Sequence, residues 1–93
     1  MKYLIGDTIR CTVTFTNFLN QATDPQLIKF ITYNRWYQVI EEVSIGDDNK
    51  SSAGNYYYDF IIPEGEGDMY YEWYGEIDGK PTVERKKITK VFV

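Results

Sequence analysis

The sequence predicts an all-β fold in which two antiparallel sheets, built from about seven strands, pack as a sandwich. Three observations support this prediction. Apolar and polar residues alternate along several segments, which is the pattern of a strand with one buried face. Turn-forming residues separate these segments at intervals of roughly 8 to 14 residues, and no segment carries a convincing helical signal. Strands so closely spaced leave no room for the long helical crossovers of a parallel sheet.

Length and composition indicate a single domain over residues 1–93. A chain of 93 residues buries only about 60 to 65% of its unfolded surface, which cannot support two separate cores. The hydrophobic content of 43% and the charged content of 26% are ordinary for a globular domain. The aromatic content of 17% is high, and the chain is expected to fold rather than stay disordered.

Residues 8–16, TIRCTVTFT, form the clearest predicted strand. Apolar residues alternate there with threonines and an arginine, so one face is expected in the core. Cys11 lies in the apolar phase and, as the single cysteine, cannot form an internal disulfide. We interpret it as a core residue rather than a nucleophile. A turn at Gly6-Asp7 precedes this strand, so residues 2–5 are expected to form a short first strand.

The segments that follow are less regular. Residues 17–25, NFLNQATDP, have turn composition. Residues 27–33, LIKFITY, are predicted to form a strand whose core-facing phase stays open, because both phases carry apolar side chains. Residues 35–45 fit either a short helix, with apolar positions at i, i+3 and i+4, or one or two strands. We favour strand, because no N-cap residue opens this segment.

Residues 46–55, GDDNKSSAGN, have the composition of a surface loop. Residues 56–62, YYYDFII, are then predicted to form a strand that ends at Pro63, and residues 64–68, EGEGD, the next turn.

The last two predicted strands form a hairpin. Asp78-Gly79 is a strong signal for a tight turn between a strand over residues 69–77 and a last strand over residues 82–93. A two-residue turn sets Glu72 opposite Arg85 and Tyr70 opposite Lys87. The period of two predicts a core face and a solvent face for the first of these strands. The core face is Met69, Tyr71, Trp73, Gly75 and Ile77, and the solvent face is Tyr70, Glu72, Tyr74 and Glu76.

The net charge of −4 and the pI near 4.7 argue against nucleic-acid binding, which needs a clustered cationic surface. We interpret the basic residues near the C-terminus mainly as a balance for the acidic residues between Asp59 and Asp78. No apolar run approaches the roughly 20 residues that span a bilayer, and the N-terminus lacks the apolar segment of a signal peptide. We therefore expect no membrane partner and synthesis in the cytoplasm.

The composition also argues against an enzyme. The chain contains no histidine, so the usual serine or cysteine triads and the common zinc sites cannot be built. Glu64 and Glu66 could form a carboxylate pair for glycoside hydrolysis, but they lie in a glycine-rich turn without an evident cleft. We expect no catalytic residue and no cofactor.

Residues 47–51, DDNKS, match the first ligand positions of a calcium loop. The match then ends, because Ser52 stands where the loop requires glycine and Tyr58 where it requires glutamate. We reject a helix-loop-helix calcium site and assign no metal ligand, while a weaker site between loop carboxylates stays open.

The segment MYYEWYG, residues 69–75, has the residue types of both a core strand and a recognition surface. We interpret it mainly as a core strand, although exposed Tyr and Trp are favoured at interfaces. The candidate partner-binding residues are Trp36, Tyr37, Tyr70, Tyr74, Arg85 and Lys87.

The strands at the two ends of the chain are candidates for pairing with another subunit, since a sandwich leaves edge strands exposed. Lysines at positions 86, 87 and 90 equally suit the opposite role, which is to block unwanted pairing at the last strand.

Several segments together resemble a known family. They are GDTIRCTVTF, DPQLIKFITY, SSAGNYYYDFIIPEGEGDMYYEWYGEIDGK and the terminal KVFV. Their order is similar to that of small immunoglobulin-like β-sandwich structural proteins of tailed bacteriophages and prophages. The cysteine pair of antibody domains is absent.

This resemblance implies an immunoglobulin-like fold and a non-enzymatic part of a virion, such as a head auxiliary or decoration protein, a head-fibre component or a neck protein. The implied partners are other virion proteins and copies of the chain itself, and the implied location is the virion after synthesis in the host cytoplasm. The alternative is a carbohydrate- or protein-binding module that uses exposed aromatic residues.

Overall fold

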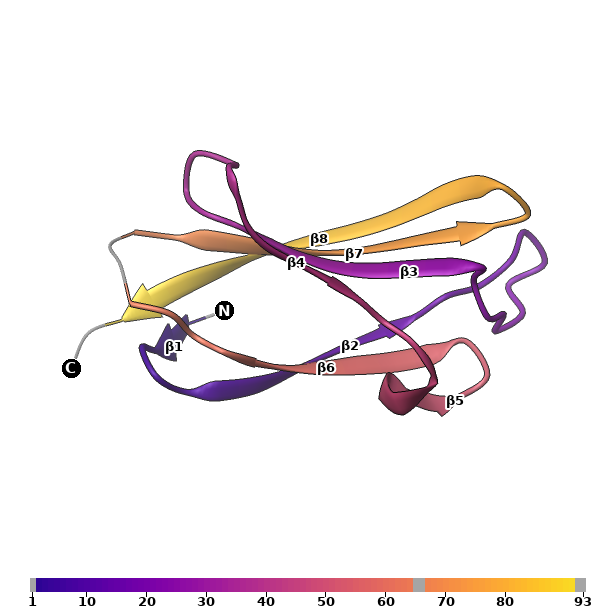
Figure 1. Ribbon diagram of the computed structural model, residues 1–93, viewed down its shortest axis with the longest axis horizontal. Coiled ribbons are helices and arrows are strands. Elements are labelled where there is room, and N and C mark those ends of the chain that lie inside the picture. Colours follow the sequence, from indigo (N-terminus) through magenta and orange to yellow (C-terminus); the bar gives the residue numbers. More distant parts are fainter. Residues whose placement is uncertain (1, 65–66, 92–93) are drawn as a thin grey trace.

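The chain folds into two β-sheets that lie face to face (Figure 1). The computed structural model describes residues 2–64 and 67–91, with Lys2, Tyr3 and Val91 described by their backbone alone. The described residues contain eight strands and one short 3-10 helix. They are β1 (Lys2–Leu4), β2 (Thr8–Thr14), β3 (Leu27–Tyr33), β4 (Val39–Ser44), η1 (Asp47–Asn49), β5 (Lys50–Ser52), β6 (Asn55–Ile61), β7 (Met69–Ile77) and β8 (Lys80–Val91).

The larger sheet has the order β1-β8-β7-β3-β4, and the smaller sheet has the order β2-β6-β5. The predicted all-β fold and the two-sheet arrangement are confirmed, with eight strands in the described part of the chain instead of about seven. One pair departs from the predicted antiparallel pattern, because β1 runs parallel to the end of β8. None of the described helices is long and apolar enough to cross a membrane.

The core lies between the two sheets and is built by alternate residues of the long strands. Phe30 on β3 lies at its centre, with ring contacts to Tyr71 at 5.5 Å and Trp73 at 5.0 Å. This placement shows which alternate residues of β3 face the core, because Phe30 points inward together with Ile28 and Thr32. Cys11 is buried as predicted, and burial raises the pKa of its thiol to about 11. The prediction that Trp73 belongs to the core is confirmed by its 0% exposure.

Two predictions for the middle of the chain need correction or refinement. Residues 35–45 are indeed not helical, but only Val39–Ser44 forms a strand, because residues 34–38 make a tight turn. The Asn34 side-chain oxygen accepts bonds from the backbone N–H groups of Trp36 at 2.9 Å and Gln38 at 3.0 Å, which is the local chemistry of an Asn turn. The loop predicted over residues 46–55 is wrong in part, since it contains η1 and the short strand β5.

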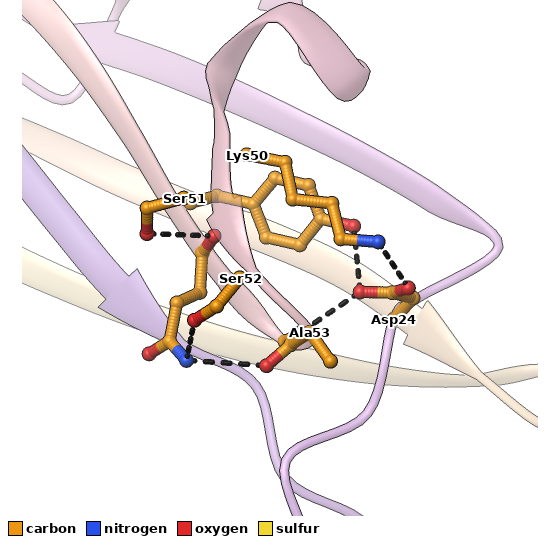
Figure 2. Close-up of polar contacts among 8 residues, drawn as sticks. Asp24, Lys50, Ser51, Ser52 and Ala53 are labelled. Carbon is orange, nitrogen blue, oxygen red and sulfur yellow. Dashed lines mark hydrogen bonds and ion pairs between the residues drawn. The ribbon is translucent and has the colours of Figure 1, made fainter.

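Asp24 ties the β2–β3 connection to the β5–β6 hairpin (Figure 2). Its carboxylate accepts bonds from Lys50 Nζ at 2.6 Å, from the Gly54 backbone N–H at 2.8 Å and from the Tyr56 hydroxyl at 3.0 Å. The Lys50 hydrogen bond, followed by that of Gly54, lowers the pKa of Asp24 to about 2. The turn between β5 and β6 is therefore held in part by Asp24, which is 30 positions away from Gly54 in the sequence. A local composition pattern does not show such a contact.

The β7–β8 hairpin follows the predicted register. Asp78 and Gly79 both have positive φ, 54° and 74°, as a type I′ turn requires. Cross-strand partners include Glu72 with Arg85 and Tyr70 with Lys87. The last strand begins at Lys80, two residues earlier than predicted, because the turn uses no further residues. Its predicted end at 92–93, and positions 65–66 of the predicted turn 64–68, lie outside the described residues.

Candidate interaction surface

The outer face of the larger sheet is the side of β3, β7 and β8 that points away from the smaller sheet. Its side chains alternate with the core residues, so the strand register defines which of them lie next to one another. Three rows cross the face: Tyr33, Tyr70 and Lys87; Ile31, Glu72 and Arg85; Lys29, Tyr74 and Val83. Four of the six predicted interaction residues thus lie on this face.

Glu72 corrects the predicted solvent face, because its exposure is only 5%. Arg85 donates to one carboxylate oxygen from Nε at 3.0 Å and from Nη2 at 2.5 Å, and the Tyr33 hydroxyl donates to the other oxygen at 3.2 Å. These charge-assisted bonds compensate the loss of water around a buried carboxylate. The same contact raises the pKa of Arg85. The pair is therefore a structural element of the outer face as well as a candidate contact.

The turn between β3 and β4 folds over one end of the outer face. In Figure 1 this turn rises above the larger sheet, away from the smaller one. Tyr37, at φ 63°, stacks on Tyr70 with ring centroids 4.7 Å apart and an angle of 21° between the planes. Their hydroxyls lie 3.4 Å apart, and this hydrogen bond raises the pKa of Tyr70. The structure thus joins two predicted residues that are 33 positions apart in the sequence.

Trp36, in the same turn, has 65% of its surface exposed. The Arg35 guanidinium lies 4.4 Å from the centre of its ring. Beside this pair is a cavity of about 380 Å³ between the turn and the segment that precedes β7, lined also by Asp68 and Lys90. Burial lowers the pKa of Lys90, which forms no ion pair with any of the residues described.

Tyr33, Tyr37 and Tyr70 form what we name the aromatic patch, and Trp36 belongs to the same turn as Tyr37. Arg85 and Lys87 lie along its border, and Lys87 pairs with Asp68 at 3.1 Å. The structure thus gathers five of the six predicted residues at one end of the sheet. Tyr74 is the exception. It lies opposite Val83, two rows further along β7 than Tyr70, and its hydroxyl donates a hydrogen bond to Glu76 at 2.9 Å.

Sequence reasoning missed two surface features, one on this surface and one at the opposite end of the molecule. The sequence leaves the inward phase of β3 open, and only the inward position of Phe30 assigns Tyr33 to the outer face. In the turn segment at the opposite end of the molecule, Phe18 is 84% exposed and Leu19 is 77% exposed. Two successive apolar residues inside a turn segment were the available signal.

The described residues contain no group of three His, Cys, Asp or Glu side chains placed to hold a metal ion. Of the residues considered for calcium, Asp47 and Asn49 lie in η1, while the Lys50 side chain is paired with Asp24. The outer face thus places flat aromatic rings beside cationic groups.

Comparison of the chain with known protein-family models, with curated proteins and with solved structures finds no match in any of the three sets.

Proposed function

We propose that the protein is a non-enzymatic structural protein of a tailed-phage virion, positioned on the head or at the neck, and that it acts through protein-protein contacts. The resemblance of its sequence motifs to phage structural proteins supports the biological setting. The aromatic patch on the outer face supports the mode of action, and this patch is the observation on which the proposal rests.

The strand order supports an immunoglobulin-like assignment within this proposal. In immunoglobulin domains, strands B, E and D share one sheet and strands C, F and G share the other, with C′ added beside C in variable-type domains. Here β2-β6-β5 occupy the positions of B, E and D, and β8-β7-β3-β4 those of G, F, C and C′. Small domains with this arrangement present faces and edges to partners and need no deep pocket.

The composition of the aromatic patch suits a protein interface. Trp, Tyr and Arg are the residue types that dominate the energetics of such interfaces. Tyr37 and Tyr70 are held by mutual stacking, and Arg85 is held by Glu72, so their side chains lose little further freedom when a partner binds. A partially ordered aromatic surface of this kind favours a partner with apolar or carboxylate groups.

Incorporation into particles tests the proposal. Particles released from a bacterium that carries the gene are purified and analysed by mass spectrometry, with the gene present as wild type or as Tyr37→Ala/Tyr70→Ala. We expect the wild-type protein in the particles at a fixed copy number and the double variant at least tenfold depleted, at about 1.4 kcal/mol per tenfold change in binding. Phe18→Ala, at the opposite end, is the matched control and should be incorporated normally.

Particles without the wild-type protein would contradict the virion role. Normal incorporation of the double variant would contradict the assignment of the aromatic patch. Circular dichroism of each purified variant separates either result from a failure to fold.

Exposed Trp36 favours carbohydrate binding as the second candidate function. Its ring offers a stacking surface, and the neighbouring cavity is lined by polar side chains that include Asn34 and Asp68. A glycan array probed with the wild-type protein and with Trp36→Ala decides between the two. Saturable glycan binding that Trp36→Ala removes would favour this candidate, and absence of glycan binding would favour the protein interface.

A further inference from the structure

The larger sheet has two edges that no other described strand covers. At one side the sheet ends with β4, which pairs only with β3. At the other side, β1 pairs with β8 at Thr89, Lys90 and Val91 alone, so the remainder of β8, from Lys80 to Ile88, has no strand on that side within the described chain. Unpaired edges expose backbone donors and acceptors that can pair with another strand.

The two edges carry opposite charge. The sequence of β4 is VIEEVS, with two glutamates and no basic residue. The sequence of β8 is KPTVERKKITKV, in which the single glutamate is outnumbered by lysines and an arginine. Charged side chains at an edge normally hinder its pairing with another strand. A strand of opposite charge is the exception, because opposite charges across a strand pair attract.

This charge distribution selects among the ways in which two copies can meet. Pairing β4 with β4 of a second copy sets glutamates against glutamates, and pairing β8 with β8 sets cations against cations. Like charges opposite each other destabilise a strand pair. Pairing of β4 with β8 is the combination in which the two edges attract.

The topology gives this third combination a defined direction. From β8 to β7, β3 and β4, each step between neighbours is antiparallel, so β4 and β8 of one molecule run in opposite directions. A second copy placed beside the first in the same orientation therefore presents its β8 antiparallel to β4. The sheet can continue from one molecule to the next without a change in its hydrogen-bonding pattern.

The side-chain faces also match in one register. Glu41 lies opposite Thr32, and Lys86 opposite Tyr71, so both point to the inner side of the sheet. Glu42 and Arg85 lie on the outer side by the same argument, opposite Ile31 and Glu72. In an antiparallel pair, the register that places Glu41 opposite Lys86 also places Glu42 opposite Arg85.

Of the four side chains concerned, Arg85 is already bound to Glu72, and Glu41 accepts a long hydrogen bond of 3.5 Å from the Tyr58 hydroxyl. Glu42 and Lys86 are more available for new contacts. Glu42 lies 3.7 Å from Lys29, and Lys86 lies 3.3 Å from Glu84, in ion pairs that are about half exposed and therefore weak. On β4, Val39 and Ile40 are 60% and 50% exposed, which is apolar surface that a neighbouring strand would cover.

We propose that a second copy of this chain docks its β8 edge on the β4 edge in antiparallel fashion, with Glu41 opposite Lys86 and Glu42 opposite Arg85. The contact joins two different surfaces, so it repeats from copy to copy and forms a ring or a filament rather than a closed dimer. This proposal deepens the proposed function by naming one protein partner, and it uses the edges of the sheet rather than the aromatic patch.

Sedimentation velocity of the purified full chain over about a hundredfold concentration range is the first test. We expect species larger than a dimer to grow with concentration at about 50 mM salt and to diminish at about 1 M salt, where surface charges are screened. A strict monomer under both conditions overturns the proposal, as does association that stops at a dimer. Neither result affects the incorporation experiment, which tests the aromatic patch.

A charge exchange tests the register. Glu41→Lys and Lys86→Glu should each weaken self-association about tenfold, because each sets like charges opposite each other. An equimolar mixture should recover association, since Lys introduced at position 41 of one variant meets Glu introduced at position 86 of the other. Lys87→Glu makes the same change of charge one residue away on the other face and should have a smaller effect.

Failure of the mixture to recover association overturns the register. If Lys86→Glu and Lys87→Glu lose self-association equally, the loss is explained by net charge alone, and the proposed register is overturned as well. Thermal unfolding of the single variants checks that the fold is retained, which we expect because both substituted side chains are exposed.

Discussion

The two faces of β7 are both closed to solvent at their centres, but by different means. Trp73 points to the inner face and is covered by the smaller sheet and by the ring of Phe30. Glu72, its neighbour in the sequence, points to the outer face, where Arg85 and Tyr33 of its own sheet bind its carboxylate. The inner face depends on apolar burial, and the outer face depends on a satisfied polar cluster, which leaves the rings above it available to a partner.

The largest expected effect concerns the inner face. Trp73→Ala should lower the free energy of unfolding by about 3 to 5 kcal/mol, because it removes a fully buried indole and leaves a cavity. Chemical denaturation measures the change, with Tyr74→Ala on the opposite face as the control, expected below about 1 kcal/mol. A loss below about 1 kcal/mol for Trp73→Ala would contradict the assignment of the inner face.

Removal of one partner of the outer cluster should have the next largest effect. Arg85→Met leaves the Glu72 carboxylate buried without its cation and should cost about 2 to 3 kcal/mol. Replacing both groups, in Glu72→Leu/Arg85→Met, should recover most of that loss, since an apolar pair needs no compensation. A double variant as unstable as the single one would show that the attraction between Glu72 and Arg85 itself stabilises the fold. The cost of an unpaired Glu72 carboxylate would then not explain the loss.

The aromatic patch should contribute less to stability. Tyr37→Ala removes the stacking contact with Tyr70 and should cost about 0.5 to 1.5 kcal/mol. Trp36→Ala, at an exposed position of the same turn, should stay within about 0.5 kcal/mol of the wild type. The thermal unfolding curves of the two variants measure the difference, and equal values would mean that Tyr37 is not held by Tyr70 in solution.

The smallest effect is expected at the exposed carboxylate of Asp24, which is outside both faces. Its pKa is lowered from 3.8 to about 2 in the folded protein, so its contribution to stability is present above pH 3.8 and is lost as the pH falls through about 2. Asp24→Asn should remove that part of the acid dependence. Unfolding measured from pH 5 down to about pH 2 on both proteins checks this, and parallel curves would contradict the role of Asp24.

Local sequence patterns predicted the parts of the fold that depend on near neighbours. The period of two placed Trp73 in the core and Tyr70 outside it, and the Asp78-Gly79 turn set the β7–β8 register, because a turn with positive φ at both residues allows one close pairing. The same local chemistry identified five of the residues that gather around the aromatic patch, but it did not indicate that they would meet.

By itself the sequence thus determined an all-β chain, the β7–β8 hairpin and the inward position of Cys11 and Trp73. Only the tertiary structure decided the phase of β3, the burial of Glu72, the stacking of Tyr37 on Tyr70 and the opposite charge of the two sheet edges. These features depend on which strands become neighbours. Strand order is set by the packing of two whole sheets, and neither side-chain period nor turn chemistry carries that information.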